Sequence, residues 1–193
     1  MKSDNLKEIV RKVVEEVLAD TEPSVRGGQM TGERISPRGA GKKLMCVALG
    51  SDHAGYPLKK KLKTFLLEDM NCSVIDCGAN SADPVDYPDI AFQVALSVAE
   101  GRCERGIMID SAGIGSSVTA NKVKGIRAAL CHDVFTATTS REHTNSNVLT
   151  LGSRVLNPGL AKQVVRVWLK TQFSGGRHQK RLDKIDRFEE NPR

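Results

Sequence analysis

The chain has 193 residues, of which 39% are hydrophobic, 27% charged and 4% aromatic. This is the composition of an ordinary globular protein, and the length suits one domain with a substantial core. The chain has no run of about 18 apolar residues, which argues against a membrane-spanning helix. Its first ten residues contain no uninterrupted apolar stretch, which argues against a secretory signal.

The net charge of +6 is concentrated outside the central part of the chain. Residues 21–43 carry a net charge of +3, and residues 177–193 carry +2. The central part therefore has no strong basic excess from which a broad basic face could form. Because aromatic residues are also scarce, the sequence argues against a nucleic-acid-binding protein.

The N-terminal residues 3–19 predict an amphipathic helix. Apolar residues recur at helical spacing from Leu6 to Leu18, and either Ser3 or Asp4 can cap the first turn. One short helix cannot bury its apolar stripe alone, so it must dock on its own domain, on a second copy or on another protein.

Residues 20–43 contain five glycines and two prolines and predict a flexible linker. A helix that packs on its own domain seldom needs so long a tether. The linker therefore favours docking of the N-terminal helix on another protein.

Residues 44–176 alternate between strand and helix patterns. We predict strands at 44–50, 72–78, 105–110, 127–131 and 147–152, and helices at 57–67, 88–99, 116–123, 134–143 and 158–171. The strands are unbroken apolar runs, as expected when helices cover both faces of a parallel sheet. The predicted fold is a Rossmann-like α/β/α sandwich of three layers with a five-stranded parallel sheet. Residues 177–193 form a charged tail that could contain one more helix.

The five cysteines are an odd number and include no C-x-x-C pair: Cys46, Cys72, Cys77, Cys103 and Cys131. Most of them lie in apolar runs. We interpret them as reduced, buried thiols of a cytoplasmic protein, in preference to a metal site or a disulfide framework.

Polar residues gather where the predicted strands end, which is where ligands bind in this class of fold. Such segments are 51–55, 86–88, 110–117 and 152–154. All four histidines fall in strand-end or helix-end segments, and we expect them near one edge of the sheet. Loops hold polar residues in any case, so this pattern is suggestive only in combination with others.

Two further patterns suit an anionic ligand. The turn at Gly113 and Gly115 precedes a helix and presents backbone N–H groups that could cradle an oxyanion, although a plain tight turn explains it equally well. Arg177 and Arg181 share a helix face and could bind a phosphate, with a solvated basic tail as the alternative. The sequence shows no metal cluster and no nucleotide motif. This inventory fits cofactor-free proton transfer on a phosphorylated sugar.

Five segments closely resemble the ribose/galactose isomerase family, which contains type B ribose-5-phosphate isomerases and the galactose-6-phosphate isomerase subunits. They are VALGSDHAGY (47–56), DYPD (86–89), AGIGSSVTANKVKGIRAALCHD (112–133), REHTNSNVLTLGSRV (141–155) and GGRHQKR (175–181). The resemblance runs from about residue 44 to about 188. It implies a cofactor-independent aldose–ketose isomerase that works as a homodimer or homotetramer with active sites shared between subunits.

The resemblance also implies a role for individual residues. Asp52 and His53 would line the sugar site, Tyr87 would close one side, and the turn from Ser111 to Gly115, with Gly113 at its centre, would hold the enediolate oxygen. Asp52 and His143 are the candidates for opening the sugar ring, and His143 would come from the neighbouring subunit. Thr144 follows His143 where asparagine is usual. The expected phosphate ligands are Arg154, Arg177 and Arg181.

The sequence departs from the family at the base that removes the C2 proton. The usual cysteine is replaced by Asp110, and the usual threonine by Ala112. A second branch has a glutamate just past the glycine turn, where this chain has Ser116 and Ser117. Either Asp110 is the base, which a carboxylate can be, or the base is lost. We predict an isomerase of ribose 5-phosphate; the alternatives are another sugar phosphate (tetrose, allose or galactose phosphate) and a non-catalytic sugar-phosphate-binding protein.

The first 20 residues resemble, less specifically, the encapsulation peptides that dock enzymes inside bacterial microcompartments. Those peptides are short amphipathic helices tethered to a catalytic domain. The resemblance implies that residues 3–19 bind a shell protein and that this cytoplasmic enzyme is packaged in a microcompartment with others that process phosphorylated sugars or their aldehyde products.

Overall fold

The computed structural model describes residues 33–37 and 44–191. The predicted helix at 3–19 and most of the predicted linker lie outside this part of the chain. Among the residues described, no helix combines the length and apolar character that crossing a bilayer requires.

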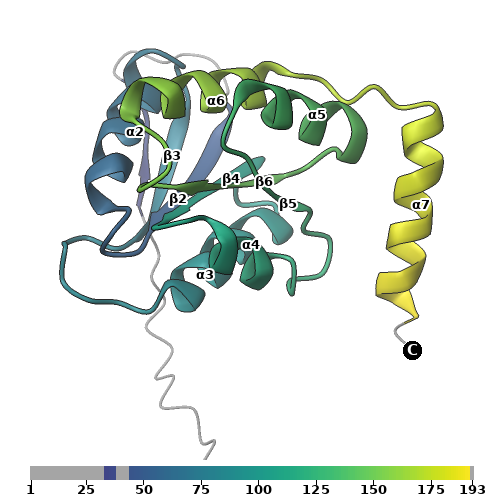
Figure 1. Ribbon diagram of the computed structural model, residues 1–193, viewed down its shortest axis with the longest axis horizontal. Helices are drawn as coiled ribbons and strands as arrows, with labels where there is room; N and C mark the ends of the chain where they lie inside the picture. Colours follow the sequence, from purple (N-terminus) through teal and green to yellow (C-terminus); the bar gives the residue numbers. More distant parts are fainter. Residues whose placement is uncertain (1–32, 38–43, 192–193) are drawn as a thin grey trace, which may run out of the picture. The chain divides into compact units, whose positions relative to one another are not determined.

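A mixed sheet of six strands forms the centre of the fold (Figure 1). Its strands are β1 (Arg34–Ile35), β2 (Cys46–Ser51), β3 (Ser73–Gly78), β4 (Arg105–Asp110), β5 (Ala128–Leu130) and β6 (Val148–Gly152). Their order across the sheet is β1-β3-β2-β4-β6-β5. Strands β2 to β6 are parallel, which confirms the five strands predicted from their apolar runs.

Strand β1 lies within the segment that the sequence predicts to be a linker. It pairs antiparallel with β3, with Arg34 opposite Ile75 and Ile35 opposite Val74. The unpaired backbone groups of an edge strand accept any extended segment, so two residues with no periodic pattern can join the sheet. The sheet therefore has one more strand than the five predicted.

Six helices complete the described fold: α2 (Tyr56–Glu68), α3 (Tyr87–Ala99), α4 (Ile114–Ala120), α5 (Val134–Thr144), α6 (Pro158–Lys170) and α7 (Arg177–Glu190). A proline within the first two positions begins α2, α3 and α6, where its missing N–H costs no hydrogen bond. Helix α4 starts two residues before the predicted position and ends at Ala120. Helix α7 confirms that the charged tail is helical.

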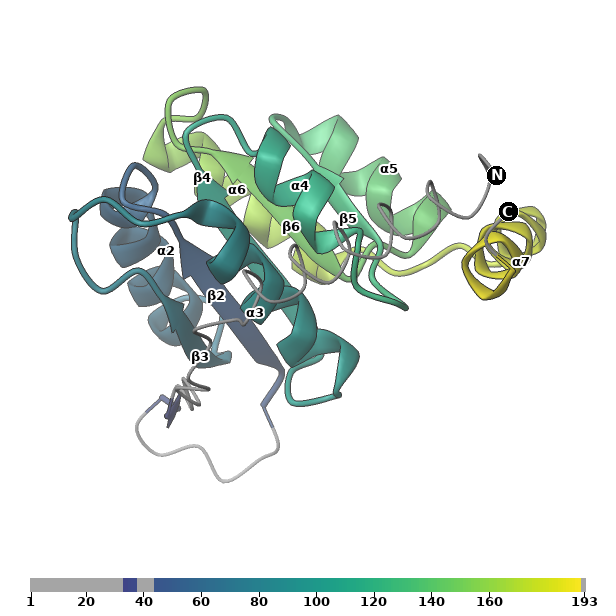
Figure 2. The same ribbon diagram turned by 90° about the horizontal axis from the view of Figure 1, so that it is seen from below.

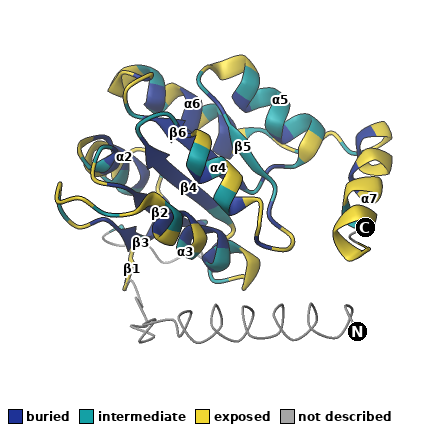
Figure 3. Cartoon of the chain, turned by 60° about the horizontal axis from the view of Figure 1, so that its bottom comes forward, coloured by how far each residue is buried: buried dark blue, intermediate teal, exposed yellow. Residues whose placement is uncertain are grey.

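The helices cover both faces of the sheet. Helices α2, α5 and α6 pack on one face and α3 and α4 on the other (Figures 1 and 2). Trp168 of α6 is fully buried in the first of the two apolar clusters. Strands β2, β3, β4 and β6 are buried almost throughout and β5 is half-buried, whereas β1 and most of α7 are exposed (Figure 3). The predicted α/β/α sandwich is confirmed.

All five cysteines are buried and none forms a disulfide bond, as the sequence predicts. Burial raises the pKa of the Cys72 thiol to about 11, and it also raises the pKa of Cys77, Cys103 and Cys131. These side chains therefore act as small apolar residues of the core rather than as nucleophiles.

The chain order reverses between β2 and β4. After β2 the chain adds β3 on one side, and after β3 it crosses to β4 on the other side. In a parallel sheet, ligands bind outside the carboxyl ends of the strands at such a reversal. We therefore expect the ligand site at the residues that follow Ser51 and Ile109.

Candidate active site

Most of the predicted sugar-binding residues gather where β2, β4 and β6 end and α3 begins. We call this group the carboxyl-edge cluster; it consists of Asp52, His53, Tyr87, Asp110, Ser111, Gly113, Gly115 and Arg154.

Backbone and side-chain hydrogen bonds hold the three strand-end loops of this cluster together. The Asp52 N–H donates to the carbonyl of Ile109 (3.1 Å), and the Arg154 N–H donates to the carbonyl of Ser111 (3.0 Å). The Ser153 hydroxyl donates to the Ala54 carbonyl (3.1 Å), which joins the loop after β6 to the loop after β2. The cluster is thus a single connected surface.

The Tyr87 ring lies against the turn that precedes α4. A Cβ atom at Gly115 would lie 2.5 Å from Cζ of Tyr87, so a larger residue there would have to displace the tyrosine ring. Gly113 has a φ of +79°, and a Cβ there would lie 2.4 Å from the Leu130 side chain. The structure thus places the Tyr87 ring beside the turn, and the positive φ of Gly113 favours glycine there. His53 is exposed, and its Nδ1 accepts a hydrogen bond from the N–H of Val85 (3.4 Å).

The Asp110 carboxylate is hydrogen-bonded entirely within its own chain. Oδ1 accepts from the N–H groups of Ala112 (2.8 Å) and Gly113. Oδ2 accepts from the N–H (3.1 Å) and the hydroxyl (2.6 Å) of Ser116. A carboxylate has about four lone-pair sites, and all four are occupied here. The Gly113 N–H, expected from the sequence to face an enediolate oxygen, is bound to Asp110 instead.

Asp52 is a buried carboxylate with fewer partners. Its Oδ1 accepts one hydrogen bond, from the N–H of Gly55 (2.7 Å), and Oδ2 has no hydrogen-bond partner among the described residues. A Cβ at Gly55 would lie 2.3 Å from the carbonyl oxygen of Ile109, so the loop after β2 is pressed against the end of β4. Asp52 therefore has an oxygen available for chemistry beside Asp110.

A cavity of about 260 Å³ opens beside this cluster between the start of α2 and the loop after β6. Arg154 and Lys61 line it from the two sides. Sequence reasoning did not single out Lys61, because a lysine in a polar helix face carries no special signal. The two cations make this cavity suitable for an anionic group.

A buried ion pair lies beneath the same edge. The Lys59 ammonium, with only 2% of its side chain exposed, contacts Oδ1 of Asp76 and the carbonyl of Ala79, each at 2.6 Å. Lys63 contacts the other Asp76 oxygen at 2.8 Å, and the Gly78 N–H donates to Oδ1 (3.1 Å). Burial alone would raise the pKa of Asp76, but these hydrogen bonds outweigh burial and lower it.

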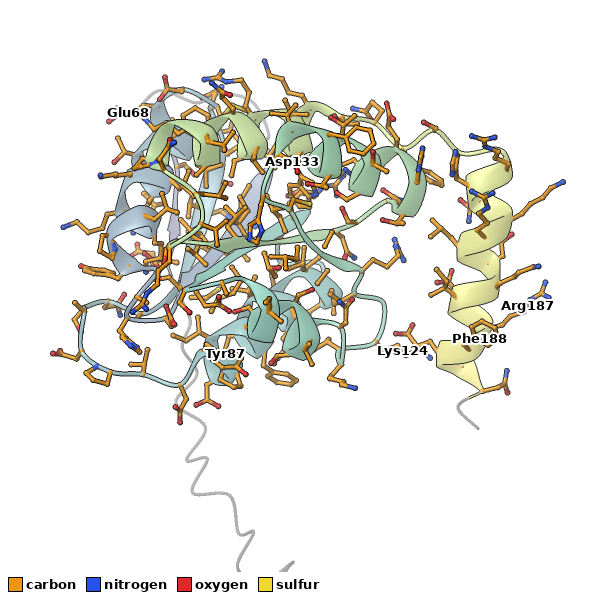
Figure 4. The ribbon with its side chains drawn as sticks, viewed as in Figure 1. Glu68, Tyr87, Lys124, Asp133, Arg187 and Phe188 are labelled. Carbon is orange, nitrogen blue, oxygen red and sulfur yellow. The ribbon has the colours of Figure 1, made fainter. Side chains whose placement is uncertain are left out.

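The remaining predicted site residues lie at the opposite edge of the sheet. We call them the amino-edge cluster: His143, Thr144, Arg177 and Arg181. His143 lies in the last turn of α5, five residues before β6 begins, and the five residues of β6 span about 16 Å at about 3.3 Å each. Arg177 and Arg181, in the first turns of α7, are exposed. Figure 4 shows Tyr87 and the α7 residue Phe188 far apart on the molecule.

His178 also belongs at this edge, although the sequence did not nominate it as a site residue. Its ring stacks on His143, with centroids 4.1 Å apart and planes 9° from parallel. Burial, together with the charges of His143, Arg177 and Arg181, lowers the pKa of His178. The expectation that all four histidines lie near one edge is wrong: His53 and His132 flank the carboxyl edge, and His143 and His178 lie at the amino edge, because α5 returns the chain across the sheet.

Within residues 33–37 and 44–191, no three His, Cys, Asp or Glu side chains gather closely enough to hold a metal ion. What the two clusters offer is carboxylates, imidazoles, guanidinium groups and backbone N–H groups. Those groups transfer protons and bind anions.

Comparison with known proteins identifies the family. The Ribose/Galactose Isomerase family model matches residues 47–185. This chain belongs to the ribose/galactose isomerase family. The resemblance predicted from the five sequence segments is thus confirmed, and β1 lies outside the matched region.

Individual members of the family resemble this chain over nearly their whole length. Ribose-5-phosphate isomerase B of Escherichia coli is 45% identical over 144 residues, which cover 75% of this chain and 96% of that protein. The D-erythrulose-4-phosphate isomerase of Pectobacterium atrosepticum is 37% identical, with 76% and 96% covered. The structure of ribose-5-phosphate isomerase B from Clostridium thermocellum superposes with a TM-score of 0.74 at 46% identity, covering 76% of this chain and 98% of that one.

Proposed function

We propose that this sugar-phosphate isomerase interconverts ribose 5-phosphate and ribulose 5-phosphate through a cis-enediolate, without a cofactor. The similar proteins named for ribose 5-phosphate support this substrate. The relative that acts on erythrulose 4-phosphate makes a four-carbon sugar phosphate the first alternative to assay.

The observation that carries this proposal is the division of the site residues between two edges of one sheet. The carboxyl-edge cluster holds the carboxylates and the turn, and the amino-edge cluster holds His143 and two arginines. Proton transfer needs heavy atoms about 2.6–3.2 Å apart, far less than the length of β6. One chain therefore holds two complementary half-sites, and a second copy brings them together as a homodimer with shared active sites.

In this arrangement the substrate lies between the two subunits. The partner's His143 opens the sugar ring beside Asp52, while Tyr87 and the turn at Gly115 enclose the reacting carbons. The partner's Arg177 and Arg181 join Arg154 in binding the phosphate. Binding energy from the phosphate, which takes no part in bond making, holds C1 and C2 in position for the reaction.

Complementation between two inactive variants tests the shared site. Asp52→Asn and His143→Asn each remove one half-site, and co-expression in one cell forms mixed dimers. Each mixed dimer has one intact site, so random pairing should restore about a quarter of wild-type turnover of ribose 5-phosphate. Co-expression of Asp52→Asn with His53→Asn, both in the carboxyl-edge cluster, should restore none. Absence of recovery in the first pair would contradict the shared site.

We further propose that residues 3–19 hold the enzyme to the shell of a bacterial microcompartment, as their resemblance to encapsulation peptides suggests. Deletion of residues 1–19 should leave turnover unchanged, because the site residues all lie beyond residue 50. It should abolish co-sedimentation of the enzyme with intact microcompartments. Retained co-sedimentation would show that the segment serves another purpose.

A further inference from the structure

The two carboxylates of the carboxyl-edge cluster stand at the ends of neighbouring strands. Ser51 pairs with Ile109 in the parallel ladder of β2 and β4, so the next residues along, Asp52 and Asp110, follow side by side. Neighbouring strands lie about 4.8 Å apart. A sugar carbon held at this edge is therefore approached from two carboxylates, and their surroundings decide which can react.

Asp110 is fully committed to the structure of the turn. Its side chain is 5% exposed and joins the end of β4 to Ala112, Gly113 and Ser116 by four hydrogen bonds. These bonds satisfy N–H groups that would otherwise be left unpaired at the start of α4. To take a proton from carbon, Asp110 would have to release at least one of these donors.

Asp52 carries the opposite combination of features. It is also nearly buried, with 6% exposed, and the Gly55 N–H fixes Oδ1, so the carboxylate cannot rotate freely. Its Oδ2 has no donor among the described residues. A fixed carboxylate with one unoccupied oxygen is the arrangement that a general base requires.

We propose that Asp52 transfers the proton between C2 and C1, and that Asp110 is a positioning residue that holds the turn before α4. This inference rests on the proposed isomerisation and assigns its base.

The step balances without a co-reactant. Oδ2 of Asp52 forms a bond to the C2 proton; the C–H electron pair becomes the C1=C2 double bond, and the carbonyl π pair moves to O1. Asp52 then returns the proton to C1, the hydroxyl proton on O2 passes to O1, and the C2=O bond forms. The carboxylate ends as it began.

Matched amide variants of the full-length protein separate the two roles. Asp52→Asn keeps an oxygen for the Gly55 N–H but cannot accept a proton. General-base loss lowers rates by about 10²- to 10⁴-fold, so we expect that fall in kcat with little change in KM or melting temperature. Exchange of the C2 proton of ribose 5-phosphate with D₂O, followed by proton NMR, should fall equally. Asp69→Asn, an exposed carboxylate at the end of α2, is the control and should change none of these values.

Asp110→Asn should behave differently. It should raise KM and lower the melting temperature, while the remaining turnover keeps the acidic limb of the pH profile of kcat/KM and the primary isotope effect of C2-deuterated substrate. Ser116→Ala removes a single donor and leaves the Asp110 carboxylate in place. Ser116→Ala should show the same changes in weaker form, and it tests the positioning role even if the Asp110→Asn variant fails to fold.

Two results would overturn the assignment while leaving the proposed function in place. Asp52→Asn with kcat and C2 exchange close to wild type would exclude Asp52 as the base while leaving the isomerase intact. Loss of C2 exchange in Asp110→Asn, at an unchanged melting temperature and KM, would make Asp110 the base. A wild-type chain that turns over neither ribose 5-phosphate nor a tetrose, allose or galactose phosphate would overturn the proposed function and this assignment together.

Discussion

Replacing Lys59 by methionine should destabilise the fold more than any single change to an exposed charge. Methionine fills similar space but leaves Asp76 with only Lys63 and the Gly78 N–H as described partners, and leaves the Ala79 carbonyl without the Lys59 donor. Removing one partner of a buried ion pair costs about 3–5 kcal/mol. Because Lys63 still contacts Asp76, the lower end applies, and the unpaired carbonyl adds about 1 kcal/mol. The expected loss is about 3–4 kcal/mol, or roughly 6–16 °C in melting temperature for a chain of this size.

Lys63→Met is the matched control for this prediction. Lys63 contacts the same carboxylate, but 28% of its side chain is exposed, and pairs of that kind contribute about 0–1 kcal/mol. Urea unfolding followed by the fluorescence of Trp168, the single and fully buried tryptophan, measures both variants. If both unfold at the same urea concentration, burial does not determine the contribution of the Lys59 pair, and the reasoning fails.

Three further outcomes follow from the described contacts. Asp76→Asn should reduce the loss of folding stability in acid. Because the pKa of Asp76 is lower in the folded state than its unfolded value of about 3.9, the ionised carboxylate stabilises the fold above that value, and this contribution is lost as the pH falls through the folded pKa. The free energy of unfolding of variant and wild type, measured across acidic pH, checks this. Gly115→Ala should force its Cβ against the Tyr87 ring and lower the folding stability by about 1–3 kcal/mol, which urea unfolding measures; an unchanged midpoint would show that the exposed ring simply moves aside. The five buried thiols should resist a disulfide reagent in the native protein and react fully in urea, and rapid native labelling, measured by absorbance, would contradict their burial.

The parallel part of the fold could be predicted because its strands are mainly apolar and show no alternation of apolar and polar residues. Strand β1 could not, because two residues paired through their backbones leave no periodicity in the sequence. The hydrogen bonds of Asp110 were equally hidden: three of its four donors are backbone N–H groups, whose direction depends on the conformation of the turn and not on residue type.

The separation of the histidines, by contrast, was predictable in principle. A helix that follows one parallel strand must return the chain to the amino edge before the next strand begins. His143 ends such a helix, so its position opposite His53 follows from the order of elements alone. The residue types alone suggested that the histidines form one cluster. The direction in which the chain runs through each strand and helix places them at two opposite edges of the sheet.

The short strand β1 has a consequence for any protein joined to this enzyme. Because β1 runs antiparallel to β3, the chain enters the sheet from the side where β3 ends, beside Asp76. If residues 1–32 were replaced by a fluorescent protein or an affinity tag, the fused protein would join the sheet at that rim, near the carboxyl-edge cluster. A fusion placed after α7 would instead extend from the helix that carries Arg177 and Arg181 of the amino-edge cluster, so the two fusion points differ in which cluster lies near them.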